Sequence, residues 1–390
     1  MATLQMKALI TAEGNTAVVS NVPIPEPAPN EIRVRVHAVA LNPVDALYVA
    51  HPPGPPGRVV GSDVAGTVEK VGEQISQWKV GDRVAGLLQG ATTSTDRPGG
   101  FAEYAVLEED LTMRIPDKVS FEEAATYPLC SLTAAQALFI RLQLPSPFAI
   151  PSTFSLNPVS ETHVPSILVY SGSTSIGLFG ISLAKLLRTP LGHPYRIFAT
   201  ASPANHTKLL DLGVEAVFDY RSPSWPEDLR SETGGIDYAF DCISEDDSVA
   251  RISQAFAPSG GKIAVIRKAA WAANGVRTGV LPVYGAAWSG LGREIEYNGE
   301  TLPASPTWRA FTVAFFEFMS QATLQGHDVF PIAPNPVRLM DGGLERIVQD
   351  GFALLGSGKV ADRQRIEETN GLRPISGEKL VYSIIPSPVI

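Results

Sequence analysis

The sequence has few of the residues that mark several large classes of protein. It holds only two cysteines, Cys130 and Cys242, among 390 residues. Two thiols are too few for a disulfide framework or a four-thiolate zinc site, and we interpret both as small buried apolar residues. The six histidines show no paired spacing with each other or with cysteine. We therefore expect no metal site, and no G-x-S-x-G turn or Cys/His constellation indicates nucleophilic catalysis.

Charge and long apolar runs are also scarce. Charged residues make up 18% of the chain, and the formal net charge is -9. Nucleic-acid binding needs clustered Lys and Arg, so we expect no nucleic-acid partner. The sequence contains no run of about 18 apolar residues that could span a bilayer, and residues 1–15 lack the apolar run of a secretory signal. We expect a cytoplasmic protein that does not associate with a membrane.

What the chain does contain is a change of pattern near its middle. In the first third, apolar and polar residues alternate and are broken by Gly, Asn and Pro, which predicts short antiparallel strands. Residues 120–142 follow a helical pattern, and Ser120 with Glu123 predicts a capping box at its start. After the Pro- and Ser-rich stretch 145–166, apolar strands alternate with amphipathic helices. That alternation indicates an α/β fold with a parallel, doubly wound sheet.

The length of 390 residues exceeds what one core usually supports, so we expect two domains. We place the boundary near residue 160, inside the Pro- and Ser-rich connection. The predicted divisions are a first domain at 1–160, a nucleotide-binding domain at 161–300 and a C-terminal segment at 301–390. A last strand at 378–385 could return to pair with the first domain.

The stretch with the clearest chemistry is "ILVYSGSTSIGLFGISLAKLL", residues 167–187. An apolar strand that leads into small residues and then a helix presents backbone N–H groups that can bind a pyrophosphate. Gly172 and Gly177 supply two flexible positions. The hydroxyls of Ser173, Thr174 and Ser175 stand where a dinucleotide turn has further glycines, and they could bind phosphate. A capped strand-to-helix turn is the alternative interpretation, and the βαβ setting favours the cofactor site.

The next strand, "RIFATAS" at 196–202, bears on the choice between NAD and NADP. A site for NAD places Asp or Glu at the end of this strand, where it binds the ribose hydroxyls. Residues 201–206 contain no carboxylate, and their hydroxyl and amide groups, with Lys208 nearby, can donate to a 2′-phosphate. The sequence therefore predicts NADPH. An N-cap formed by Ser202 or Asn205 is compatible with that role.

Several motifs, taken in order, resemble the medium-chain dehydrogenase/reductase superfamily. They are "ALNPVDALY", "VVGSDVAGTVEKVGEQISQWKVGDRVAG", "GGFAEYAV", "ILVYSGSTSIG" and "SGEKLV". Zinc-dependent members carry a ligand cysteine near Asn42 and a His-Glu pair at the position of Ser62 and Asp63, so the chain resembles the zinc-independent branch. "ATASPANHTKLLDLGVEAVFDYRSP" and "YAFDCIS" are similar to the fungal trans-acting enoyl reductases, the family of the lovastatin-pathway enoyl reductase.

This resemblance implies a Rossmann domain together with a GroES-like, mainly antiparallel β catalytic domain. It implies an NADPH-dependent enoyl reductase that acts on α,β-unsaturated polyketide thioesters. The substrate would be held on the carrier protein of a partner polyketide synthase, or of a hybrid with a nonribosomal peptide synthetase, in secondary metabolism. An apparent insertion occupies residues 360–374.

The resemblance also implies a set of binding residues. Against the nicotinamide end it places Pro43, Val44, Asp45 and Ala46, and against the pyrophosphate Ser173, Thr174, Ser175 and Ile176. Around the 2′-phosphate it places Ser202, Pro203, Ala204, Asn205 and Tyr220. The cofactor cleft would be completed by Val265, Ile266, Arg267, Ile375 and Ser376. The substrate would pass along Thr133, Ala134, Ala135, Gln136, Ala137, Leu138, Phe139 and Ile140, and along Val280, Leu281, Pro282, Val283 and Tyr284.

The implied reaction adds a hydride from NADPH to the β-carbon and a proton to the α-carbon, and the protein orients both partners. The catalytic proton donor is unknown: Tyr48 is a candidate beside a packing or gating role, and bulk water is another source. For Asp45 we expect a local turn hydrogen bond. Two other functions stay open, namely a stand-alone NADPH quinone or enone reductase and a non-catalytic cofactor-binding partner of a synthase.

A carrier protein is usually acidic, so an anionic reductase needs a local basic patch to bind one. Arg277 and Arg293 are candidates for such a patch. Their alternative role is that of ordinary solvated surface charges.

Overall fold

The computed structural model describes residues 4–154, 163–268, 271–359 and 372–384. The chain divides into two compact units, unit 1 (Met1–Leu129 with Trp288–Ile390) and unit 2 (Cys130–Ala287). Residue 160, where the sequence placed a boundary, and most of the apparent insertion lie outside the described residues. Residues 130–154 group with unit 2, because their buried side chains bond to its strands, as the Arg141 guanidinium does to Val265.

Unit 2 contains a parallel sheet with the strand order β10-β9-β8-β11-β12-β13. This order is that of a doubly wound nucleotide-binding fold, in which the order of the strands reverses between β8 and β11. It confirms the predicted fold class. Its strands are β8 (Ser166–Tyr170), β9 (Arg196–Ala201), β10 (Ala216–Asp219), β11 (Tyr238–Asp241), β12 (Gly261–Val265) and β13 (Val280–Tyr284).

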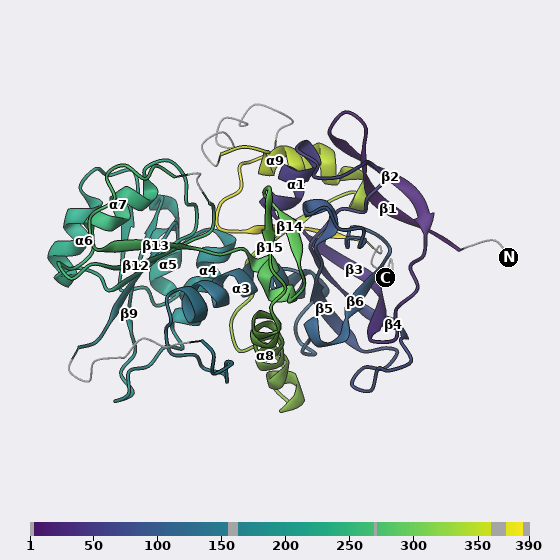
Figure 1. Cartoon of the computed structure of the whole chain (residues 1–390), viewed down its shortest axis with the longest axis horizontal. Helices are drawn as coiled ribbons and strands as arrows, with labels where there is room; N and C mark the ends of the chain where they lie inside the picture. The colour runs from purple at the N-terminus through teal and green to yellow at the C-terminus, as the bar shows by residue number, and fades with distance from the viewer. Residues whose placement is uncertain (1–3, 155–162, 269–270, 360–371, 385–390) are drawn as a thin grey trace. The chain divides into compact units, whose positions relative to one another are not determined.

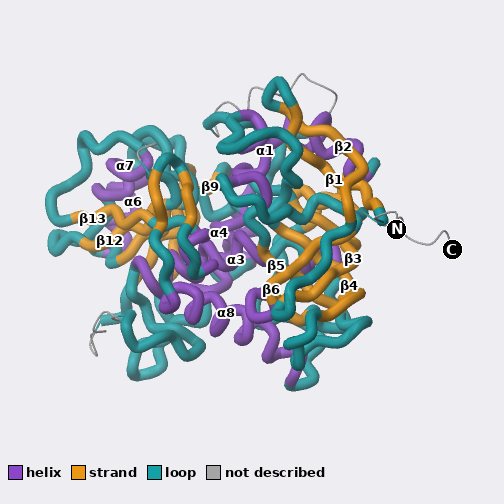
Figure 2. The backbone as a smooth tube through the Cα atoms, turned by 45° about the vertical axis from the view of Figure 1, so that its right-hand side comes forward, coloured by secondary structure: helices purple, strands orange, loops and turns teal. Residues whose placement is uncertain are grey.

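Helices cover both faces of this sheet, which is why its central strands are apolar throughout. Leu168 of β8 belongs to a core cluster with Trp225 of α6 and Ile252 of α7. On the other face, α4 packs so closely that a Cβ on Gly180 would meet the Phe240 ring at 3.0 Å. Figures 1 and 2 show these helices beside the strands. They are α4 (Ser175–Ala184), α5 (His206–Asp211), α6 (Trp225–Thr233) and α7 (Ser248–Gln254).

The helical pattern over 120–142 forms three consecutive pieces. Ser120 caps α2 (Phe121–Ala124), and its backbone N–H donates to Glu123, so the predicted capping box is confirmed. Pro128 begins α3 (Pro128–Ala135), because proline fits the first helical position but cannot continue an earlier helix. The last piece is a π-helix, η3 (Gln136–Arg141).

Unit 1 is built around a curled, mainly antiparallel sheet with the order β16-β17-β3-β4-β5-β7, and β6 also pairs with β3. Its last strand, β17, pairs with β3 through Val381 and Ala40, so the C-terminal strand does return to the first part of the chain. The strands are β3 (Glu31–Ala40), β4 (Asp63–Val71), β5 (Arg83–Leu87), β6 (Tyr104–Glu108), β7 (Thr112–Arg114), β16 (Val337–Met340) and β17 (Lys379–Ser383).

Two hairpins and several helices complete unit 1. Val34, Val64 and Leu107 lie at the centre of its apolar core, with no exposed surface. Within the described part of the chain, no helix combines the length and apolar character needed to cross a bilayer. The remaining elements are β1 (Gln5–Ala12), β2 (Thr16–Pro23), α1 (Pro43–Ala50), η1 (Gly90–Thr92), η2 (Glu109–Leu111), η5 (Ala287–Leu291), β14 (Ile295–Tyr297), β15 (Glu300–Leu302), α8 (Pro306–Leu324), η6 (Gly343–Arg346), η7 (Ile347–Phe352) and α9 (Ala353–Leu355).

Candidate functional site

The carboxyl edge of the unit 2 sheet is a continuous row of strand ends. Asp241 pairs in register with Tyr170 on one side and with Val265 on the other, and Val265 pairs with Tyr284. The turns that follow these strands therefore leave the sheet side by side. Ligands of doubly wound folds bind outside this edge, at the point where the strand order reverses. That point lies between β8 and β11.

The turn after β8 begins α4 and is held together by one side chain. Thr174 is the N-cap of α4, and its hydroxyl accepts a hydrogen bond from the Gly177 N–H at 3.1 Å. The same hydroxyl donates to the Ser171 carbonyl at 2.9 Å. A Cβ on Gly177 would lie 2.7 Å from the Ser171 carbonyl oxygen, so only glycine fits this position. The Thr174 cap agrees with the alternative interpretation of this stretch, a capped strand-to-helix turn. The first turn of α4 nevertheless lies at the carboxyl edge of the sheet.

The turn is also fastened to the neighbouring strand. Thr200 of β9 accepts the Ser171 N–H on its hydroxyl and the Gly172 N–H on its carbonyl, both at 2.8 Å. These two bonds fix the backbone that leads into α4. The partly exposed residues Ser173, Ser175 and Ile176 follow on that backbone. The arrangement suits the pyrophosphate of a dinucleotide, because the N–H groups of a first helical turn lack acceptors within the helix and favour an anion.

The loops after β9 and β10 also lie next to each other, because Ala201 pairs in register with Asp219. Ser202 and Asn205 are joined by a hydrogen bond between their side chains. Pro203 and Ala204 between them are exposed, and Tyr220 is partly exposed. The structure therefore brings together the residues predicted around the 2′-phosphate.

A carboxylate at the end of β10, Asp219, and a cation just after that strand, Arg221, were not part of the prediction. Asp219 lies 2.9 Å from the Arg221 guanidinium, and this hydrogen bond lowers the pKa of the Asp219 carboxyl. Arg221 also lies over the Tyr220 ring, 5.6 Å from its centroid. The cation therefore neutralises the carboxylate beside the predicted 2′-phosphate residues.

The segment after β12 lies at the other half of the edge. Val265 is buried and Ile266 and Arg267 are partly exposed. The Ile266 N–H donates to the Ser244 hydroxyl at 3.0 Å, and Arg267 forms a 2.9 Å ion pair with Glu245. These contacts attach the predicted cofactor segment to the loop after β11.

The predicted substrate residues of unit 2 form one helical segment and one edge strand. In the helical segment only Thr133 and Ile140 reach the surface, while 134–139 are buried. The other segment, 280–284, is β13, which pairs with β12 and is the last strand in the sheet order. Leu281 on it is 58% exposed, so its side chain is open to solvent.

In unit 1, the predicted residues 43–46 form the first turn of α1. Pro43 and Val44 are at least partly exposed, whereas Asp45 and Ala46 are buried. Asp45 accepts the Asn42 N–H at 2.8 Å and the Ser62 hydroxyl at 2.7 Å. Burial raises the pKa of Asp45 to about 7, against these hydrogen bonds. The expected turn hydrogen bond is thus confirmed.

Asn42 and Asp63, which stand where the resemblance places metal ligands in zinc-dependent members, both contact a buried lysine. The Lys379 ammonium of β17 donates to Asp63 at 2.7 Å, to Asn42 at 3.1 Å and to the Thr126 carbonyl at 3.2 Å. The other Asp63 oxygen accepts the Leu129 N–H at 2.8 Å. In the described ranges no three His, Cys, Asp or Glu side chains are grouped as metal ligands.

Tyr48 is 8% exposed, and its hydroxyl donates to Asn298 at 2.5 Å, in the turn between β14 and β15. A fixed partner of this kind supports a packing or gating role more than proton donation. Ile375 and Ser376 lie before β17, where Ile375 is partly exposed and Ser376 is exposed. The predicted site residues of unit 1 are thus Ile375, Ser376 and the first turn of α1.

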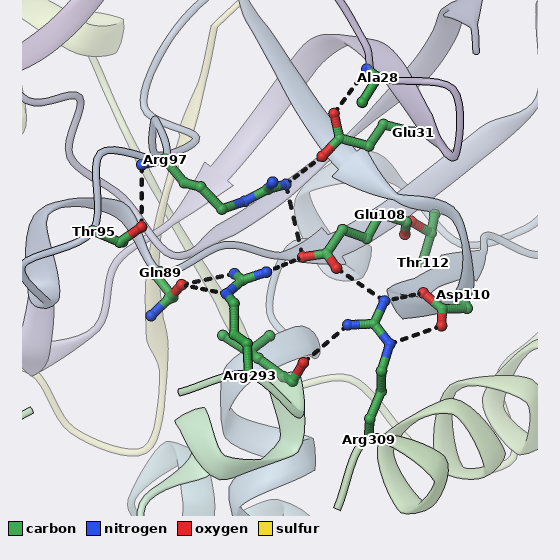
Figure 3. A network of polar contacts seen from close by, with 11 residues as sticks. Ala28, Glu31, Gln89, Thr95, Arg97, Glu108, Asp110, Thr112, Arg293 and Arg309 are labelled. Carbon is green, nitrogen blue, oxygen red and sulfur yellow. Dashed lines mark hydrogen bonds and ion pairs between the residues drawn. The ribbon is translucent and has the colours of Figure 1, made fainter. Parts of the chain in front are cut away.

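The two arginines considered for carrier docking are bound within the protein. Arg277 donates to the carbonyls of Phe256 and Ala257. Arg293 donates to Gln89 at 2.7 Å and to Glu108 at 2.6 Å. Figure 3 shows Arg293, Arg97 and Arg309 converging on Glu108. Burial raises the pKa of Glu108, but these cations outweigh it and lower the pKa. Both guanidinium groups thus have partners within the protein, and carrier docking through them stays a prediction.

Three residues with a clear structural role at these sites were not found from the sequence. Arg221 directly follows Tyr220, so a basic residue beside a predicted phosphate site was a usable signal. Lys379 lies in the motif "SGEKLV" but meets Asp63 across 316 positions. Arg141 lies near the end of a helical pattern, and nothing in the sequence distinguishes this buried cation from a surface cation.

Comparisons with known proteins agree with this geometry. The family model of the alcohol dehydrogenase GroES-like domain matches residues 28–117. The enoyl reductase cheB of Chaetomium globosum is 33% identical over 388 residues, which cover 97% of this chain and 94% of that protein. The trans-enoyl reductase ACTTS2 of Alternaria alternata is 34% identical over 383 residues, covering 98% and 99%.

Solved structures show the same fold. The CurK enoyl reductase superposes with a TM-score of 0.67 at 20% identity, covering 97% of this chain and 99% of that one. A quinone oxidoreductase from Coxiella burnetii gives a TM-score of 0.66 at 20% identity, covering 98% and 100%. Membership of this superfamily implies a nicotinamide cofactor, which the carboxyl edge of unit 2 fits. The chain belongs to the trans-enoyl reductase family of the medium-chain dehydrogenase/reductase superfamily.

Proposed function

We propose that this protein is a trans-acting, NADPH-dependent enoyl reductase. Its substrate is an α,β-unsaturated polyketide thioester on the carrier protein of a partner polyketide synthase or of a hybrid with a nonribosomal peptide synthetase. The observation that carries this proposal is the match over almost the whole chain to proteins named enoyl reductase and trans-enoyl reductase. The doubly wound sheet with a capped phosphate turn supports it.

The choice of NADPH rests on the loops after β9 and β10. The end of β9 offers the Ser202 hydroxyl and the Asn205 amide, and no carboxylate that would bind ribose hydroxyls or repel a phosphate. The carboxylate in the adjacent strand, Asp219, is already paired with Arg221. A 2′-phosphate can share that guanidinium, since arginine presents several donors in a planar fork.

For the reaction, the bound cofactor would supply a hydride for the β-carbon of the thioester. The protein orients the reacting carbons and stabilises the negative charge that develops on the thioester oxygen. In our proposal the first turn of α4 binds the pyrophosphate, and Thr133 and Ile140, the surface residues of the helical segment, contact the acyl chain. The α-carbon takes its proton from water.

The proposal is tested by following NADPH oxidation with two substrates. One is an α-methylcrotonyl or longer enoyl pantetheine thioester, and the other is a simple quinone. We expect turnover of the thioester, and faster turnover when the same acyl group is loaded on the partner synthase's carrier protein. Faster turnover of the quinone would instead support a stand-alone quinone reductase.

Cofactor choice is measured separately, by comparing the dissociation constants of NADPH and NADH. We expect NADPH to bind more tightly, and Arg221→Ala to reduce this preference. Arg188→Ala is a suitable control, because Arg188 is an exposed arginine after the end of α4 whose guanidinium donates to the backbone carbonyls of Lys185 and Leu187. Equal affinity for the two cofactors would contradict the NADPH assignment.

A further inference from the structure

Arg141 is a buried cation whose partners are all backbone carbonyls. It is the last residue of the π-helix η3, and it is 5% exposed. Its guanidinium donates to Val265 at 2.7 Å, to Thr133 at 3.1 Å and to Gly285 at 3.3 Å. The three carbonyls belong to the end of β12, to α3 and to the residue after β13. One side chain thus joins three separate segments of unit 2.

No carboxylate balances this charge among the described residues, and the Arg141 Nε is buried without a hydrogen-bond partner. The titratable groups that influence it are Tyr284 and Cys242, and burial raises the pKa of the Cys242 thiol. Burial lowers the pKa of Arg141 to about 10, so the guanidinium is still protonated at neutral pH. A buried cation without a counter-ion is costly, because carbonyl dipoles only partly replace its hydration.

The position of this charge suggests what it does. Val265 and Tyr284 pair in register at the carboxyl edge of the sheet, on the β11-β12-β13 side of the reversal. In a doubly wound fold the adenosine half of the dinucleotide lies on the β8-β9 side, and the nicotinamide half lies on the other. A Cβ on Gly285 would meet the Arg141 Cδ at 3.0 Å, so the guanidinium stem rests directly on this edge. The uncompensated charge of Arg141 therefore lies on the side of the sheet edge where the nicotinamide half of the cofactor binds.

We propose that Arg141 is a positioning residue whose charge makes the site prefer the reduced cofactor to the oxidised one. The inference rests on the nicotinamide cofactor of the proposed function. The nicotinamide ring is neutral in NADPH and carries a positive charge in NADP⁺. A fixed cation in a poorly solvated region repels the oxidised ring and leaves the reduced ring unaffected. The same repulsion promotes release of NADP⁺ after each turnover.

The test measures the dissociation constants of NADPH and NADP⁺ in the absence of any enoyl substrate. We expect the wild-type protein to bind NADPH more tightly, and Arg141→Met to reduce the ratio of the two constants roughly tenfold. That factor corresponds to about 1.4 kcal/mol of differential binding between the two forms. Arg141→Lys retains the charge and should keep most of the preference. Arg188→Met, which removes an exposed arginine bonded to carbonyls, should leave the ratio unchanged.

The ratio separates an electrostatic role from a purely structural one. If Arg141 only held the strands together, Arg141→Met would weaken both forms equally, and the inference would be overturned while the proposed function stood. If neither form binds to the wild-type protein, the cofactor assignment fails as well. If Arg141→Met does not fold, Arg141→Gln is measured. Should that variant also fail, the wild-type ratio decides, and tighter or equal binding of NADP⁺ overturns the inference.

Discussion

The hydroxyl of Thr174 accepts the backbone N–H of Gly177 at 3.1 Å and donates to the Ser171 carbonyl at 2.9 Å. The same side chain therefore closes the phosphate turn and caps α4. Thr174→Ala should lower the free energy of unfolding by about 1 kcal/mol, the usual cost of a lost N-cap. Urea denaturation measures this loss, and Thr174→Ser, which keeps the hydroxyl, should retain most of the stability.

The neighbouring hydroxyl should behave differently. Ser173 makes no side-chain hydrogen bond with the rest of the described chain, and it is partly exposed at the carboxyl edge. Ser173→Ala should weaken NADPH binding by a few fold, the loss of one hydrogen bond of about 1 kcal/mol, with no change in stability. Unchanged affinity in Ser173→Ala would mean that this hydroxyl does not contact the cofactor. Thr174→Ala would then remain a stability variant only.

Local sequence patterns were enough to predict this turn. They did not predict contacts between residues far apart in the sequence. The strand before Ser171 and the helix after Thr174 are visible as apolar periodicity, and the capping box of Ser120 and Glu123 spans three residues. The pairing of β17 with β3 brings together residues more than 300 positions apart, such as Val381 and Ala40. Periodicity carries no information about such partners, so the sequence indicated a return of the last strand to the first domain without naming the strand it pairs with.

Side-chain roles were harder to predict than elements. The pattern over 120–142 indicated one helix, but Pro128 divides it and its end widens into a π-helix. That change determines where Arg141 points, and hydrophobic spacing does not reveal it. Likewise, nothing in the sequence distinguishes Arg293 from an ordinary surface charge. Its ion pair with Glu108 forms only in the tertiary fold.

The buried pair of Lys379 and Asp63 should be essential for stability. Their side chains are 2% and 0% exposed, and the ammonium lies 2.7 Å from the carboxylate. Lys379→Met leaves the Asp63 charge buried without its cation, which should cost about 3–5 kcal/mol of unfolding free energy. Removal of both charges in Lys379→Met with Asp63→Asn should be less harmful than the two separate losses added together. Strict additivity of the two changes would contradict a direct interaction.

Stability should depend on pH through Asp45. Burial raises its pKa to about 7 in the folded protein, against about 3.9 for an unperturbed carboxyl group. The folded state therefore binds more protons than the unfolded state in this range. The stabilising contribution is complete below about pH 4 and is lost as the pH rises towards 7, at about 1.4 kcal/mol for each unit of pKa difference.

The contribution of Asp45 is isolated by comparison with Asp45→Asn, which cannot titrate. The difference in unfolding free energy between the wild type and this variant should change between pH 4 and pH 7, in favour of the wild type at the lower pH. Measurements at constant ionic strength exclude a general salt effect. A difference that stays constant across this range would show that Asp45 is ionised in the folded protein throughout.

Arg293 should act as a structural residue and not as a docking residue. Its guanidinium lies 2.6 Å from Glu108, which also contacts Arg309 at 2.9 Å. Arg293→Glu would replace this attraction with repulsion between two partly buried carboxylates, and it should cost about 2–4 kcal/mol of unfolding free energy. Arg293→Gln removes the charge without introducing repulsion and should cost less. Unfolding in urea ranks the two variants, and activity on a free pantetheine thioester should fall together with activity on the carrier-bound substrate. A selective loss of carrier-bound turnover in a fully stable variant would instead assign Arg293 to carrier recognition.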